Sequence, residues 1–231
     1  MSATTPKSAY WLGVRDGAPF VLAVAPFAML FGVVATEAGL DLLQTLSFSI
    51  VVIAGAAQFT ALQLMVEQAP VIIVLATALA VNLRMAMYSA ALVPYLGEAP
   101  LRTRAFAAYF LVDQSYASSI ARFEQNPGWG LSQRTAYFFG AITLVCPMWY
   151  VMTVVGALLG NAIPGGLALD FALPITFLAL IAPMLRTRAH AAAAVVSVAL
   201  ALTFAFLPYN LGLLIAALAG MMTGAALERR A

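Results

Sequence analysis

The sequence contains very few charged residues. Only 9% of its 231 residues are charged, while 64% are hydrophobic. Soluble domains average about 25% charged residues. A soluble fold of this length could not bury so much apolar surface, so we expect an all-α integral membrane protein that is embedded in a lipid bilayer. The net charge of +2 is too small to suggest a nucleic-acid partner.

Cysteine and histidine are almost absent as well. The single cysteine, Cys146, excludes an intrachain disulfide and a zinc site built from cysteines. The single histidine and the lack of a glycine-rich phosphate loop argue against the common catalytic motifs. We therefore expect no enzymatic activity, no catalytic residues, no cofactor and no metal site.

Long charge-free runs occupy most of the chain. About 20 helical residues cross a bilayer, and turn-forming segments at 161–166 and 207–210 divide the two longest runs. The polar first 16 residues show no cleavable signal, so the first span would serve as an uncleaved anchor. The pattern predicts one transmembrane domain over 1–231 with about eight helices: 17–36, 42–66, 71–96, 105–121, 135–160, 167–185, 190–207 and 211–227.

Basic residues predict the orientation of these helices. Eight spans place both termini on one side, and the positive-inside rule makes that side cytoplasmic. The loop with Arg102 and Arg104 would then lie on the outer side of the membrane, as an exception to this rule. A re-entrant segment at 42–68 would move these two arginines inside, but it would turn the later basic loops outward. Eight basic residues would lie inside: Lys7, Arg15, Arg122, Arg134, Arg186, Arg188, Arg229 and Arg230.

Two opposite charges fall inside predicted spans. Arg84 lies near the middle of the span 71–96, and Asp113 near the middle of the span 105–121. An arginine at the centre of a membrane helix costs about 2.5–3.5 kcal/mol on insertion scales, so it usually faces a partner or a wet cavity. Because the two helices are neighbours and run in opposite directions, the two side chains should meet at one depth and form an ion pair.

Polar and aromatic side chains accompany this pair. A guanidinium can bind the carboxylate of an amino acid by two hydrogen bonds, and an aspartate can bind the ammonium group or carry a coupling proton. The alternative is a buried ion pair that fixes helix register and binds nothing. The candidate substrate-binding or coupling residues are Arg84, Asp113, Gln58, Asn82, Tyr88, Gln114 and Tyr116.

Proline and glycine add two further expectations. Pro19 and Pro26 should interrupt the first helix, as broken helices do at transporter sites, or merely kink a packing helix. The motifs at 156–160 and 220–224 place glycines four residues apart. Such motifs let membrane helices approach closely, either within the chain or at a partner subunit.

A succession of short motifs resembles the AzlC family, the large subunit of two-component branched-chain amino-acid exporters. The similarity covers most of the chain and is densest from about 13 to 120. Two positions depart from the family pattern, with Met85 in place of a histidine and Gln114 in place of a glutamate. Asp113 is then the sole acid at this point. The motifs are Gly17-Ala18-Pro19-Phe20, Pro26, Phe31-Gly32, Ala54-Gly55-Ala56-Ala57-Gln58-Phe59, Asn82-Leu83-Arg84 and Asp113.

The resemblance implies export of branched-chain or similar amino acids across the bacterial inner membrane, together with a small hydrophobic AzlD-like partner. With the buried charges, it favours a secondary active transporter driven by the proton motive force. One alternative is a non-transporting subunit that scaffolds or regulates a transport complex, and its charge pair would tolerate apolar replacement. A passive channel is a further alternative, but such a protein would need few buried charges.

Overall fold

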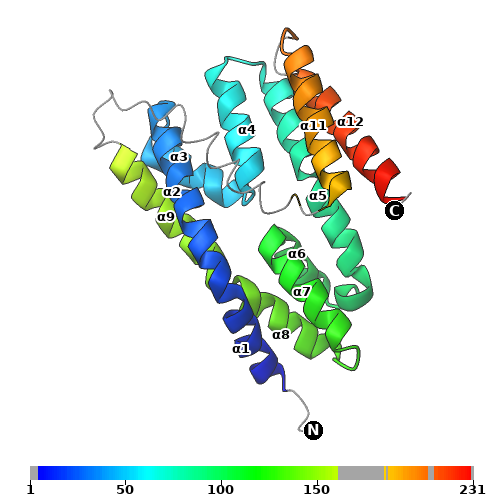
Figure 1. The fold of residues 1–231 in the computed structure, drawn as a ribbon. Helices are drawn as coiled ribbons and strands as arrows, with labels where there is room; N and C mark the ends of the chain where they lie inside the picture. The colour runs from blue at the N-terminus through cyan, green and yellow to red at the C-terminus, as the bar shows by residue number, and fades with distance from the viewer. Residues whose placement is uncertain (1–4, 161–184, 186, 208–210, 230–231) are drawn as a thin grey trace. The chain divides into compact units, whose positions relative to one another are not determined.

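The computed structural model describes residues 5–160, 185, 187–207 and 211–229, and every regular element in these ranges is a helix (Figure 1). The chain packs as two compact units, and the helix at Val71–Leu96 passes from one to the other. Unit 1 comprises Met1–Leu62 and Ala78–Pro164, and unit 2 comprises Gln63–Thr77 and Gly165–Ala231. The functional residues considered below belong to unit 1.

The helices of the described residues follow one another with short connections. In unit 1 or shared with unit 2 are α1 (Pro6–Gly17), the 3₁₀ turn η1 (Ala18–Phe20), α2 (Val21–Glu37), α3 (Leu42–Val51), α4 (Gly55–Val66), α5 (Val71–Leu96), α6 (Leu101–Tyr109), α7 (Asp113–Gln125), α8 (Leu131–Ile142) and α9 (Val145–Gly160). Unit 2 also contains α11 (Arg188–Thr203) and α12 (Leu211–Glu228).

Four helical stretches are long and apolar enough to cross a membrane: Pro6–Glu37, Val71–Leu96, Leu131–Gly160 and Leu211–Glu228. The apolar helices α3 and α11 are shorter. The observed bounds resemble the predicted spans at 71–96 and 211–227, while α11 starts two residues earlier and ends four residues earlier than predicted. The predicted span 167–185 lies almost wholly outside the described residues. The prediction of about eight spans with both termini cytoplasmic stays a prediction.

Two predicted spans are each broken into two helices. The span 42–66 is wrong as a single helix, because residues 52–54 separate α3 from α4. The break follows a β-branched run from Ile50 to Ile53, whose side chains crowd a helical turn. The span 105–121 is wrong in the same way, because residues 110–112 separate α6 from α7.

The second break is stabilised by Ser115. Its hydroxyl accepts a hydrogen bond from the Val112 backbone N–H at 2.9 Å and lies 2.9 Å from the Val112 carbonyl and 3.2 Å from the Phe110 carbonyl. A serine that binds the backbone in this way competes with continuous helix. As a result, α7 begins at Asp113.

The two prolines of the first helical stretch differ in their effect. The predicted interruption at Pro19 is present, because Pro19 lies in η1, whereas the prediction for Pro26 is wrong, because α2 continues through it. The fifth predicted span begins earlier, at Leu131, and is divided at 143–144. Pro147 explains this division, because it lacks the N–H that would bond to the Thr143 carbonyl.

Glycines bring two long helical stretches together in unit 1. The stretch α1–α2 lies alongside α8–α9 (Figure 1). A Cβ at Gly13 would collide with the Tyr137 carbonyl, and one at Gly32 would collide with the Thr153 carbonyl. Because the residue numbers rise together along both stretches, they run parallel. The glycines at 156 and 160 also pack against α2, so this motif forms an interface within the chain.

Candidate functional site

Arg84 and Asp113 form an ion pair, as the sequence predicts. Nη2 of Arg84 on α5 lies 3.2 Å from Oδ2 of Asp113 on α7. The side chains keep 37% and 43% of their exposure, so the pair is reachable from outside the protein and is not sealed in the core. An ion pair with this access can exchange its internal contact for a ligand, which a fully buried pair cannot do without disrupting the core.

Asp113 occupies a different place in its helix from the one predicted. The expectation of a mid-helix carboxylate is wrong, because Asp113 is the first residue of α7. At this position the free N–H groups of the first turn carry partial positive charge, which stabilises a carboxylate. Arg84 and the N-terminus of α7 therefore hold Asp113 from two sides.

Two polar atoms of the pair have no hydrogen-bond partner among the described residues. They are Arg84 Nε and Asp113 Oδ1, and each is shielded from solvent. Asn82 Oδ1, two residues before Arg84 on α5, is a third such atom. Buried polar atoms normally have a partner, and leaving one unpaired costs about 1–3 kcal/mol. The pair thus offers one donor and one acceptor that the described residues do not use.

Two tyrosines flank the pair. The rings of Tyr88 on α5 and Tyr116 on α7 stack with centroids 4.1 Å apart and planes inclined by only 8°. The Tyr88 side chain also interacts with the Asp113 carboxylate. The stack joins the two helices that carry the charges, so it fixes the spacing of Arg84 and Asp113.

The lipid-facing side of α5 is distinct from the side that carries the charge. Leu83 and Met87 are 64% and 71% exposed, and both are apolar. Arg84 and Tyr88 are half-buried against the protein. The arginine therefore lies on the protein-facing side of its helix, as an intramembrane charge requires.

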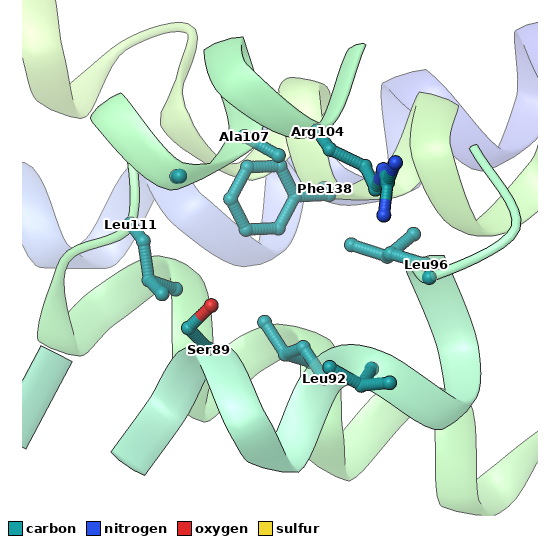
Figure 2. Close-up of a pocket in the computed structure, with 10 residues that line it drawn as sticks. Ser89, Leu92, Leu96, Arg104, Ala107, Leu111 and Phe138 are labelled. Atoms are coloured by element: carbon teal, nitrogen blue, oxygen red, sulfur yellow. The ribbon is translucent and has the colours of Figure 1, made fainter. Parts of the chain in front are cut away.

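An apolar pocket lies further along α5, where α6 and α8 face it (Figure 2). Its cavity volume is about 90 Å³. Ser89 and Leu92 of α5 line one side, Ala107 and the Phe138 ring lie across from them, and Leu111 of the break before Asp113 lies at one end. Arg104 lies at the edge and is exposed. Leu111 is two residues before Asp113. The non-helical segment 110–112 therefore connects the pocket to the ion pair.

The remaining predicted residues do not all lie near the Arg84–Asp113 pair. Gln114 follows Asp113 in α7, and its backbone carbonyl accepts a 2.8 Å hydrogen bond from Ser118. Gln58 is fully buried on α4, and its Nε2 donates to Ser49 Oγ at 3.0 Å rather than to the pair. Pro19 and Pro26 are both exposed. The structure thus gathers Arg84, Asp113, Tyr88 and Tyr116, with Gln114 next to Asp113 in the chain. It shows no contact between the Asn82 side chain and this group, because residues two apart on a helix do not face each other.

Sequence reasoning missed a second charged cluster. Arg122 Nη2 donates to Asp16 Oδ2 at 2.6 Å, and the Tyr137 hydroxyl donates to the same oxygen at 2.8 Å. This cluster joins α7, α1 and α8. The signal was present, because Asp16 and Arg122 both border predicted spans, but their pairing across 106 residues of sequence could not be read from spacing alone.

Comparisons with known proteins find one matching family model and two relatives that are membrane proteins. The family model described as AzlC protein matches residues 19–163. The chain is 27% identical to the inner membrane protein YgaZ of Escherichia coli over 190 residues, which cover 77% of this chain and 76% of that protein. It is 28% identical to an uncharacterized membrane protein of Archaeoglobus fulgidus over 225 residues, which cover 95% and 96%. No solved structure matches the chain.

Proposed function

The chain belongs to the AzlC family and is a membrane protein, and from this premise we propose that it is a secondary active transporter that exports branched-chain or similar small apolar amino acids. It acts in the bacterial inner membrane, without enzymatic chemistry, together with a small hydrophobic AzlD-like subunit. Transport is coupled to the proton motive force. The observation that carries the proposal is the half-exposed Arg84–Asp113 pair with its unused polar atoms.

The unused atoms complement an amino-acid backbone. An amino-acid zwitterion has a carboxylate that accepts hydrogen bonds and an ammonium group that donates them. Arg84 supplies donors for the carboxylate, in the forked geometry that guanidinium groups favour. Asp113 Oδ1 is an acceptor for the ammonium group. A bound substrate would therefore pair two atoms that the described residues leave unpaired.

The pocket beside the pair supports an aliphatic substrate side chain. Ser89 is five residues after Arg84, which places it about 7.5 Å further along α5. From there to Leu96 the pocket wall is formed almost entirely by apolar side chains. A cavity of about 90 Å³ suits a few methyl and methylene groups, and its polar lining is limited to Ser89 at one end and Arg104 at the edge. This arrangement favours valine, leucine and isoleucine over charged amino acids.

Coupling is assigned to Asp113. The ionised carboxylate would hold the substrate ammonium group, while Arg84, 3.2 Å from it in the free protein, turns to the substrate carboxylate. A proton on Asp113 would remove this charge and release the amino acid. Proton binding and substrate binding would then oppose each other, as the exchange of an inward proton for an outward amino acid requires.

Gradient-driven transport in proteoliposomes tests this assignment. The protein is purified with its partner subunit and reconstituted, and flux of labelled leucine is followed under an imposed proton gradient. Asp113→Asn should abolish gradient-driven flux while leaving the protein folded. The matched control is Glu124→Gln, which removes an exposed carboxylate from the same helix and should retain flux. Unchanged flux in Asp113→Asn would show that Asp113 is not the coupling residue.

A further inference from the structure

A second polar cluster lies inside unit 1, at the break between α3 and α4. Its members come from three helices: Thr45 and Ser49 from α3, Gln58 from α4 and Thr153 from α9. All four are fully buried, with 0% relative exposure. Four polar side chains at one buried place in a membrane protein require a reason, because each costs free energy to remove from water.

The cluster forms a chain of short polar contacts. Gln58 Nε2 donates to Ser49 Oγ at 3.0 Å, and Ser49 Oγ lies 3.2 Å from Thr153 Oγ1. The Thr153 hydroxyl donates its proton to the Trp149 carbonyl at 2.9 Å. The Thr153 oxygen therefore directs its lone pairs towards Ser49 and not its hydrogen.

The chain of contacts leaves two atoms unused. Thr45 Oγ1 and Gln58 Oε1 are buried and have no hydrogen-bond partner among the described residues. Rotating the Gln58 amide by half a turn would place Oε1 at the Nε2 position, 3.0 Å from Ser49 Oγ. The oxygens of Gln58, Ser49 and Thr153 would then follow one another in a row. The Thr45 oxygen would lie near them, because Thr45 is one helical turn before Ser49 on the same face of α3.

We propose that this cluster binds a monovalent cation of the sodium class. Sodium is a hard cation that binds oxygen ligands. Two oxygens each about 2.4 Å from one hard cation and at right angles to each other are about 3.4 Å apart. The 3.2 Å separation of Ser49 Oγ and Thr153 Oγ1 is close to this value, and it is longer than the usual hydroxyl hydrogen bond of about 2.7–2.8 Å.

The helix break supplies a favourable electrostatic field. Ser49 lies in the last turn of α3, and residues 52–54 do not continue the helix. The Phe48 carbonyl keeps the Val52 N–H at 2.9 Å, and the Ile50 carbonyl accepts from the Tyr109 hydroxyl at 2.7 Å. The carbonyl groups of this last turn carry the negative end of the helix dipole. Unwound carbonyl ends of broken membrane helices bind sodium ions in several transporter folds.

The side-chain chemistry selects the charge of the ion. No carboxylate belongs to the cluster, so the ligands are neutral hydroxyl and amide oxygens. Sites for divalent ions such as calcium normally include carboxylates. A neutral site of this kind suits a single positive charge, and the proposal is independent of whether Asp113 couples transport to protons.

Thermal unfolding of the full-length protein in detergent tests the proposal without measuring transport. Melting is followed at constant ionic strength in sodium chloride, potassium chloride or choline chloride. Sodium should raise the melting midpoint in a saturable way, by about 5 °C when its concentration greatly exceeds the dissociation constant. Choline should have no such effect. Equal midpoints in sodium and choline would overturn the proposal and indicate that the cluster holds only water.

Thr45→Val is the decisive variant, because Thr45 Oγ1 makes no hydrogen bond to any described residue. Valine should preserve the fold and the midpoint in choline but remove most of the sodium response. Thr60→Val is the matched control, since the Thr60 hydroxyl bonds to the Ala56 carbonyl of its own helix, at 2.8 Å. It should keep the full response. A Thr45→Val protein with the full sodium response would overturn the proposal, and Ser49→Ala repeats the test if Thr45→Val does not fold.

Discussion

Arg122 on α7 donates a 2.6 Å hydrogen bond from Nη2 to Oδ2 of Asp16 on α1. Tyr137 donates to the same oxygen, and the guanidinium lies 5.9 Å from the centre of the Tyr137 ring. This cluster differs from the Arg84–Asp113 pair, because its side chains are only 29% and 24% exposed and its charges have partners from the chain. We interpret it as a structural connection between helices.

Breaking this connection should destabilise the protein and leave the coupling site intact. Asp16→Asn should lower the free energy of unfolding by about 1.5–3 kcal/mol, the usual worth of a hydrogen bond to a charged group. A double-mutant cycle with Arg122→Gln measures the coupling, since the double variant should lose less than the sum of the single variants. The readout is chemical or thermal unfolding in detergent. Additive losses would contradict a direct interaction.

The charge pattern of the sequence predicted the Arg84–Asp113 pair. Each residue is a single charge within a long apolar segment, and two opposite charges on neighbouring helices stabilise each other by pairing. The helix breaks at 52–54 and 110–112 were not predicted. They depend on a β-branched run and on the Ser115 side chain, whose effects are small in isolation and compete with tertiary packing.

Long-range pairings were also beyond the sequence. Nothing in the spacing of residues indicates that Ser49 meets Thr153, or that Gly13 packs against α8. Such contacts depend on which helices become neighbours, and hydropathy does not determine this. Gln58 illustrates the consequence. The sequence showed a polar side chain within an apolar segment, but it did not indicate which residue that side chain would bond to.

Variants of the stacked tyrosines Tyr88 and Tyr116 distinguish the contribution of ring packing from that of the Tyr88 hydroxyl. Tyr88→Phe should keep the stack with Tyr116 and change the free energy of unfolding by less than about 0.5 kcal/mol, but it should weaken leucine binding because the hydroxyl beside Asp113 is lost. Tyr116→Ala should remove the stack, which is worth about 0.5–1.5 kcal/mol beyond the buried area. Unfolding and the KM for leucine flux are measured for both. A Tyr88→Phe protein with unchanged KM would exclude a role for the hydroxyl in substrate binding.

The parallel packing of α2 and α9 predicts a steric requirement at Gly156. A Cβ there would collide with the Met29 backbone carbonyl, and backbone cannot move as a side chain can. Gly156→Ala should therefore cost about 1–3 kcal/mol, as overpacking does. Gly128→Ala is the control, because no atom lies within 4 Å of a Cβ built at that position. Melting midpoints compare the two variants, and similar midpoints would contradict the close approach of these helices.

Filling the apolar pocket should change substrate selectivity. Ala107 lies on α6 and lines the pocket, so Ala107→Leu should occupy part of its volume of about 90 Å³. If the pocket receives the substrate side chain, leucine flux should fall by about 10-fold or more, since one or two displaced methylene groups are worth about 1–3 kcal/mol. Alanine, which needs little of the pocket, should lose far less.

The matched control for this experiment lies on the same helix. Ala105 is exposed, so Ala105→Leu adds the same side chain away from the pocket and should leave both fluxes unchanged. Competition of unlabelled amino acids against labelled leucine gives the selectivity of each variant, and unfolding confirms that both are folded. Equal loss of leucine and alanine flux in Ala107→Leu would mean that α6 affects transport in general. The pocket would then not select the side chain, and selectivity would have to be sought at the Arg84–Asp113 pair itself.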